Sequence, residues 1–215
     1  SSMARDIPPE VMALARSFGS RFVQAVPMPP SSIALQSCDE YPRVQVDFTA
    51  NTTRLLDGIA TMRPRGGNNF VAHLLDPDDG ALTLAARGTK ERSVVLVTDA
   101  FWQAMEPNEL QAAVDLCQAS GIRFFAVVLT ERRLSQTGIV SSFRTLAEQT
   151  GGDVFEGVIT DSLAAAIANA VAGSIDGIEP CDLQWTSSPI CPQASERRIT
   201  VGVRGVDTVD VLIPA

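Results

Sequence analysis

Histidine is nearly absent from this sequence of 215 residues, which contains only His73. The four cysteines include no Cys-x-x-Cys pair, so a zinc site has almost no ligands to draw on. With one histidine, a Ser-His-Asp set is not credible, and no Cys-His pair is placed by spacing. The Gly-x-x-x-x-Gly-Lys form of a phosphate loop is also missing. The sequence therefore predicts a binding protein and not an enzyme.

Basic residues and long apolar runs are also scarce. Lys and Arg total 17 against 25 Asp and Glu, which gives a formal net charge of -8 and a pI near 4.6. Nucleic acid is not an expected partner, because binding to a phosphate backbone needs clustered positive charge. No apolar run approaches the ~20 residues that span a bilayer, and the N-terminus has no basic segment followed by an apolar core. We expect no membrane span and no intact signal peptide, although a signal could have been removed upstream.

The first half of the chain mixes helices and strands. Residues 7–26 carry apolar side chains at spacings of three and four, with prolines confined to the first turn, which predicts an amphipathic helix. Two candidate strands follow at residues 31–38 and 43–49, and in the second we expect Val44, Val46 and Phe48 to face inward. Short helices are predicted at residues 51–62 and after the glycine pair in residues 65–69.

The second half alternates strands with helices. Apolar strands are predicted at residues 93–99, 121–130 and 151–158, and helices at residues 109–119, 141–149 and 161–175. Strands that are apolar on both faces, joined by helices, indicate a parallel sheet covered on each side. The sequence thus predicts an α/β fold with a doubly wound, mostly parallel sheet over residues 1–175.

A small all-β appendage is predicted at residues 179–215, where period-two patterning appears in residues 181–187, 197–204 and 206–215. Three strands are fewer than the roughly seven of a complete sandwich, so the segment looks partial. Cys181 and Cys191 flank a turn rich in Pro, Ser and Thr, which suits a disulfide and a location outside the cytosol. Two free thiols in a cytosolic protein are the alternative.

Asp99 stands where a buried strand ends. Ligands of open parallel sheets lie beyond the carboxyl ends of the strands, so this carboxylate is a candidate ligand-binding group. Asn68 and Asn69 can present amide oxygens from a glycine-rich loop, and the hydroxyls of Ser1 and Ser2 are further donors for a hard divalent cation. A capping or turn aspartate is the alternative role for Asp99.

The order of these motifs resembles a von Willebrand factor type A domain over about residues 1–175. The strongest matches are "LVTDA", "GIRFFAVV" and "LAEQTGGDVFEG", whose order and spacing together are fairly specific. The resemblance implies a metal-ion-dependent adhesion site for Mg²⁺ or Ca²⁺. Ser2 matches the last Ser of the family's Asp-x-Ser-x-Ser motif, Asn68 stands where a Thr is expected, and Asp99 matches the final Asp.

Two departures from the family make this metal site degenerate or incomplete. The Thr is replaced by Asn68, and the first strand, normally central, has no counterpart here, nor do the Asp and first Ser of its motif. A central gap leaves backbone groups of two strands unpaired, so we expect a cleaved upstream segment or a partner to supply the strand. The C-terminal tail, residues 206–215, is a third source, although its alternating pattern suits a half-exposed strand better.

The expected function is protein–protein interaction or adhesion outside the cytoplasm, at a bacterial cell surface or in a secreted multidomain protein. Asn69, Phe101 and Trp102 are candidate partner-binding residues beside the metal site, with core packing as the alternative for the two aromatics. The alternative function is a structural or assembly subunit that uses strand donation and has no functional metal site. Metal-assisted hydrolysis ranks third, because no general base is evident.

Overall fold

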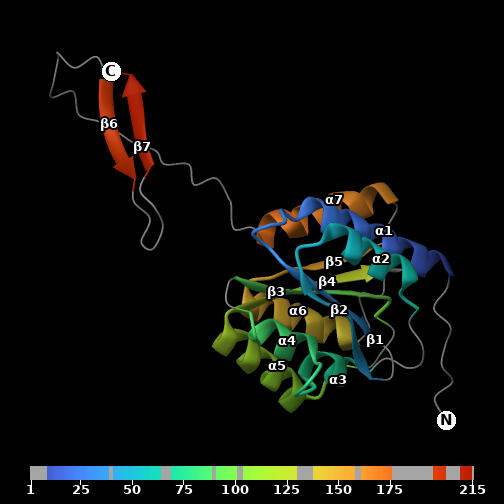
Figure 1. Cartoon of the computed structure of the whole chain (residues 1–215). Helices are drawn as coiled ribbons and strands as arrows, with labels where there is room; N and C mark the ends of the chain where they lie inside the picture. Colours follow the sequence, from blue (N-terminus) through green and yellow to red (C-terminus); the bar gives the residue numbers. More distant parts are fainter. Residues whose placement is uncertain are drawn as a thin grey trace, which may run out of the picture. The chain divides into compact units, whose positions relative to one another are not determined.

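In the computed structural model, a parallel three-stranded sheet forms the middle layer of the larger, α/β part of the chain (Figure 1). The structure describes residues 9–38, 41–63, 69–88, 91–100, 104–129, 138–157, 161–175, 196–201 and 209–214. The sheet has the order β3-β4-β5, with both pairs parallel. Its strands are β3 (Arg92–Thr98), β4 (Ile122–Leu129) and β5 (Val154–Gly157). Strands β4 and β5 fall within the predicted strands, and β3 begins one residue before the predicted one.

Strand β4 is apolar on both faces because helices cover both faces. Phe124, Ala126 and Val128 pack into one apolar cluster. Phe125, Val127 and Leu129 pack into another, as expected for side chains that alternate along a strand. A strand in this position has no face for water, which explains its continuous apolar run.

Two layers of helices form these clusters with the sheet (Figure 1). Helices α1 (Pro9–Ala25) and α7 (Asp161–Ile175) cover one face. The helices of the other face are α3 (Phe70–Leu75), α4 (Ala81–Ala86), α5 (Pro107–Ser120) and α6 (Gly138–Thr150). The predicted doubly wound α/β fold is therefore confirmed.

Strands β1 (Ile33–Cys38) and β2 (Pro42–Thr49) form a separate antiparallel hairpin. Helix α2 (Thr52–Thr61) packs on it through Leu55 and Ile59. The prediction that Phe48 faces inward is wrong, since this side chain is 45% exposed. Register shifts on either side of Leu35 break the two-residue alternation of the pair, which is the physical reason.

Local signals fix the ends of some helices better than apolar spacing does. Glu106 and Glu109 form a reciprocal capping box at the start of α5, and Gly121 ends it with φ 62°. Helix α4 was not predicted, because six residues give too little periodicity. Among the described residues, no helix combines the length and apolarity needed to cross a bilayer.

The chain divides into two compact units, Ser1–Glu179 and Pro180–Ala215. In the second, β6 (Glu196–Val201) and β7 (Val209–Pro214) form an antiparallel hairpin. These are two of the three strands predicted there. Cys181 and Cys191 lie outside the described residues, so their disulfide stays a prediction.

The glycine pair of "LAEQTGGDVFEG" allows β5 to enter beside β4. Gly151 ends helix α6 with φ 73°, a backbone conformation that favours glycine. A Cβ on Gly152 would lie 1.7 Å from the carbonyl oxygen of Phe124, so no larger residue fits without moving the backbone. The pair is thus required by the close approach of two strands.

Gly152→Ala should lower the free energy of unfolding by about 2–3 kcal/mol, because the new methyl group overlaps the backbone of β4. Gly173→Ala is the matched control, since Gly173 lies in helix α7 with open space around its Cα. This change should raise stability by about 0.5–1 kcal/mol through helix propensity. Urea unfolding followed by circular dichroism measures both changes in stability, and equal changes would contradict the close approach of Gly152 to the backbone of β4.

Candidate functional site

The carboxyl end of β3 makes a sharp turn, and we call Thr98–Ala100 the rim. The N–H of Ala100 donates a hydrogen bond of 2.9 Å to the hydroxyl of Thr98. Ala100 is fully buried and has φ 52°, which costs a non-glycine residue about 1–2 kcal/mol. A strained backbone directly beside an acidic residue is a feature found at functional sites.

The chain returns to the core shortly after the rim. Met105 is buried, and its N–H donates to the hydroxyl of Ser142 on helix α6 at 3.1 Å. Residues 101–103, between Ala100 and Met105, lie outside the described part of the chain. The described residues Ala100 and Met105, on either side of this stretch, are therefore both buried.

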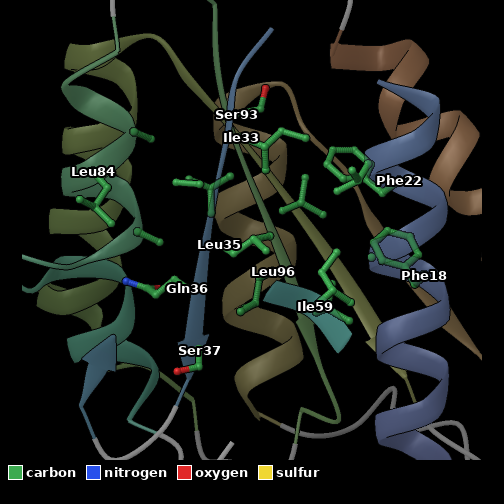
Figure 2. Close-up of a pocket in the computed structure, with 18 of the residues that line it drawn as sticks. Phe18, Phe22, Ile33, Leu35, Gln36, Ser37, Ile59, Leu84, Ser93 and Leu96 are labelled. Carbon is green, nitrogen blue, oxygen red and sulfur yellow. The ribbon is translucent and has the colours of Figure 1, made fainter. Parts of the chain in front are cut away.

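A cavity of about 1000 Å³ extends from the rim between β1 and β3, and we call it the slot (Figure 2). Its strand walls include Ile33 and Leu35 of β1 and Leu96 of β3. Thr98 and Asp99 also line it, and Asp99 is half-buried there. The predicted site residue Asp99 thus stands at the end of a strand and beside a cavity.

Asn69 caps helix α3. Its side-chain oxygen accepts a hydrogen bond of 3.1 Å from the N–H of Ala72, and the residue is exposed. The next residue, Phe70, lines the slot together with Asp99. The end of the glycine-rich loop and the rim therefore border one cavity, while the role of Asn69 toward a partner stays a prediction.

The other predicted site residues, Ser2, Asn68, Phe101 and Trp102, lie outside the described residues. Their parts in a metal site or a partner surface stay predictions. Asp99 is therefore the predicted metal ligand that the structure places.

Comparison with solved structures identifies the architecture. A von Willebrand factor type A protein from Catenulispora acidiphila superposes with TM-score 0.58 at 13% identity, over 77% of this chain and 38% of that chain. The vWF domain of the type V pili tip protein Mfa5 from Porphyromonas gingivalis gives TM-score 0.55 at 16% identity. The match covers 80% of this chain and 91% of that chain. The larger unit has a von Willebrand factor type A fold.

An aerotolerance-related membrane protein from Bacteroides fragilis, solved with multiple mutations to serine, shares the A-type fold with TM-score 0.59. Its identity is 16%, over 83% of this chain and 94% of that chain. No protein-family model and no curated protein matches the sequence. At these identities the comparisons establish the fold and leave the function to be argued from the site.

The described part of the A-type fold does not hold a full set of metal ligands. Asp99 offers one carboxylate, and the described residues contain no group of three His, Cys, Asp or Glu side chains that could hold a metal ion. A hard cation takes about six oxygens. The described residues alone therefore do not fit Mg²⁺ or Ca²⁺.

The acidic loop between α3 and α4 uses its first carboxylate to shape a turn. Asp76 accepts hydrogen bonds from the N–H groups of Asp79 at 2.9 Å and Asp78 at 3.0 Å. These bonds, with Asp79 the larger cause, lower the pKa of Asp76 below its ordinary value. This loop orders the connection to α4, which forms part of the slot wall.

Cys117 is a free, fully buried thiol on α5, so it is not paired with Cys38. Burial raises the pKa of this thiol to about 12, because the thiolate loses hydration in an apolar surrounding. The thiol is protonated at neutral pH and is therefore not a nucleophile. A cysteine-dependent reaction at this position is not supported.

The sequence led us to expect a gap where a central strand is missing, but not the side chains that line the slot, because its walls come from distant segments. Ser93, within an apolar strand, was one available signal. Its hydroxyl is buried and has no hydrogen-bond partner among the described residues. A polar side chain inside an apolar run marks a position where a partner group is needed.

Ala100→Val should lower the free energy of unfolding by about 2–3 kcal/mol, because a β-branched side chain is poorly suited to positive φ and has no room. Ala100→Gly is the control and should change stability by less than about 1 kcal/mol, since relief of strain offsets the lost methyl contact. Urea unfolding measures the free energy of unfolding of both variants. Equal losses would show that the rim backbone is not strained.

The stability advantage of the native chain over Cys117→Ala should shrink as pH rises from 9 toward 12. The folded thiol has the raised pKa, so its stabilising effect is complete below pH 9, where the unfolded thiol also keeps its proton. Above pH 9 the unfolded state ionises first and the advantage is lost. Urea titrations of both proteins at pH 7, 9 and 10.5 measure the difference in their free energies of unfolding. A difference that stays constant with pH would contradict the effect of burial on the thiol.

Proposed function

We propose that the chain is a protein-binding module of the adhesion type, which contacts its partner at the rim. The position of Asp99 carries the proposal. It is a half-buried carboxylate directly before a strained residue, at the end of a central strand and beside a large cavity. Sites of open α/β sheets form at this end of the strands.

The catalytic readings find less support in the described residues. Cys117 is protonated, and His73, which lines the slot from helix α3, is buried and not exposed at the rim. A binding role needs neither a nucleophile nor a base. It needs a fixed backbone, and Ala100 and Met105 are both buried, with the N–H of Met105 hydrogen-bonded to Ser142.

The second part of the proposal concerns a divalent metal ion at the rim. Asp99, with Ser2 and Asn68, forms a degenerate site whose affinity for Mg²⁺ or Ca²⁺ is weak unless a partner's acidic side chain adds a ligand. A single placed carboxylate supports weak affinity, since calcium sites gain affinity with the number of charged ligands. Phe101, Trp102 and Asn69 are proposed as partner contacts around it.

The proposed location is extracellular or at a bacterial cell surface. The predicted Cys181–Cys191 disulfide and the similarity in fold to a pilus tip domain support it. The second candidate function is an assembly subunit without a working metal site. The observation behind that candidate is that β1 and β3 line the cavity and, among the described residues, do not pair with each other.

The test immobilises the purified chain and measures binding to a panel of purified secreted and bacterial surface proteins by biolayer interferometry. For each binder, Asp99→Ala should weaken affinity at least tenfold, because it removes the one placed carboxylate of the rim. EDTA should weaken binding as well if the partner completes the metal site.

Asp57→Ala is the matched control, since Asp57 is an exposed aspartate on α2 that does not line the slot. It should leave binding unchanged. If no surface protein binds, or if both substitutions have the same effect, the rim is not the binding surface. Binding that is indifferent to EDTA and to Asp99→Ala, together with assemblies that survive dilution, supports the assembly function instead.

A further inference from the structure

Strand β2 has an open edge on the side away from β1. Among the described residues it pairs with β1 and with no other strand. An open edge presents backbone N–H and C=O groups that another strand can bind. The large apolar side chains that are exposed in the described part of the chain also lie here. Tyr41, directly before the strand, is 72% exposed and Phe48 is 45% exposed, so the edge combines open backbone with apolar surface.

Several features of β2 would reject an arbitrary strand. Pro42 has no N–H to donate, and the register shifts on either side of Leu35 bend the hairpin. Arg43 and Asp47 place two exposed charges of opposite sign on the strand. A strand without matching groups would cover these charges and leave them unpaired, which is unfavourable. The edge therefore selects a strand whose own charges match.

The sequence of β2 matches itself when a second copy runs antiparallel to it. With Gln45 opposite Gln45 of the second copy, Arg43 of each copy lies opposite Asp47 of the other, because both positions are two residues from the centre. Opposite charges directly across an antiparallel pair stabilise it, whereas like charges destabilise it. Two-fold symmetry forms the ion pair twice, as in other contacts between identical surfaces. A second copy is thus a strand that pairs both charges.

The same register places a neighbour beside both exposed aromatic side chains. Phe48 lies opposite Pro42 of the second copy, and Tyr41 lies opposite Thr49 of the second copy. The Cβ atoms of directly opposed residues lie about 4.5–5.5 Å apart, which lets an aromatic ring contact the residue across from it. Each contact forms twice. The pairing therefore removes from water the apolar surface that the single chain exposes.

The groups that would form this ion pair are available in the single chain. Neither Arg43 nor Asp47 takes part in an ion pair between described residues. Oδ1 of Asp47 accepts a hydrogen bond of 2.8 Å from the N–H of Phe48. A carboxylate accepts through both of its oxygens, so Oδ2 of Asp47 can bind a guanidinium while this bond persists. Pairing with a second copy therefore does not require the local structure of β2 to change.

We infer that β2 is an interaction surface for a second copy of this chain, which pairs antiparallel with it about Gln45 through two Arg43–Asp47 ion pairs. The contact is one short, bent strand edge and is small beside a standard interface, so the dimer is weak, with a Kd on the order of 10–100 µM. The two-fold axis stands perpendicular to the shared sheet and reverses the direction of every strand. The two rims of the dimer therefore face in opposite directions.

Sedimentation velocity of the full 215-residue chain, at concentrations from about 5 to about 500 µM, measures the dimer. The chain should shift from monomer to dimer across this range. Sodium chloride at about 0.5 M should weaken the dimer severalfold, because salt screens exposed charges. A chain that stays monomeric over the whole range would overturn the inference.

Charge reversal tests the register. Arg43→Asp and Asp47→Arg each place like charges across the contact, and each should weaken the dimer at least tenfold. An equimolar mixture of the two variants should form a heterodimer, since every charged pair between them is again of opposite sign. The double variant Arg43→Asp/Asp47→Arg should dimerise like the native chain for the same reason. Recovery in the mixture would also show that neither single variant had lost its fold.

Arg54→Asp is the matched control, because Arg54 is an exposed arginine on helix α2 and not on β2. It makes the same change in charge as Arg43→Asp and should leave the dimer unchanged. If Arg54→Asp and Arg43→Asp weaken the dimer equally, or if mixing the two β2 variants does not restore it, another surface forms the dimer and the inference is wrong. A dimer that neither β2 variant weakens would overturn it as well.

This inference does not depend on partner binding at the rim. Asp99→Ala leaves β2 intact and should leave the sedimentation of the chain unchanged. Arg43→Asp should in turn leave the affinity of a single rim for its partner unchanged. Loss of partner binding in Asp99→Ala concerns the proposed function alone, and loss of the dimer in Arg43→Asp concerns the β2 edge alone.

Discussion

The parallel pairing of β3 with β4 is the interaction on which the rest of the structure depends. The two strands are in continuous register from Arg92 opposite Ile122 to Thr98 opposite Val128. Of the eight residues of β4, only Arg123 is not fully buried. A shift of one residue would exchange the side chains that face the two helical layers, so this register is strongly determined. It also fixes where β3 ends, and therefore where Asp99 stands.

The rim shows how this rigid pair supports an unfavourable local conformation. Ala100 adopts positive φ although it has a Cβ, which costs about 1–2 kcal/mol. The full burial of Ala100 and the hydrogen bond between Met105 and Ser142 hold the chain on either side of the turn. Stabilisation of the surrounding core thus offsets strain at the position next to the candidate binding group.

The parts of the fold that could be predicted are those whose signal is local. The central strands read as apolar runs because both faces are buried, and Asp99 could be placed because it directly follows such a run. Phe48 was assigned to the wrong face because the bulges beside Leu35 depend on pairing with another strand. A gap in the sheet was expected from the missing strand, but the lining of the slot could not be predicted, since its walls combine Phe18, Leu35, Leu84 and Leu96 from segments far apart in the chain.

The slot and the rim are coupled by geometry. Thr98 and Asp99 belong to the rim and also line the slot, so the candidate binding group stands where the cavity reaches the carboxyl end of β3. Leu96, two residues before Thr98 on the same strand, lines the cavity as well. A change in packing along the slot therefore acts on the strand that positions Asp99, so the rim and the cavity beside it behave as one structural feature.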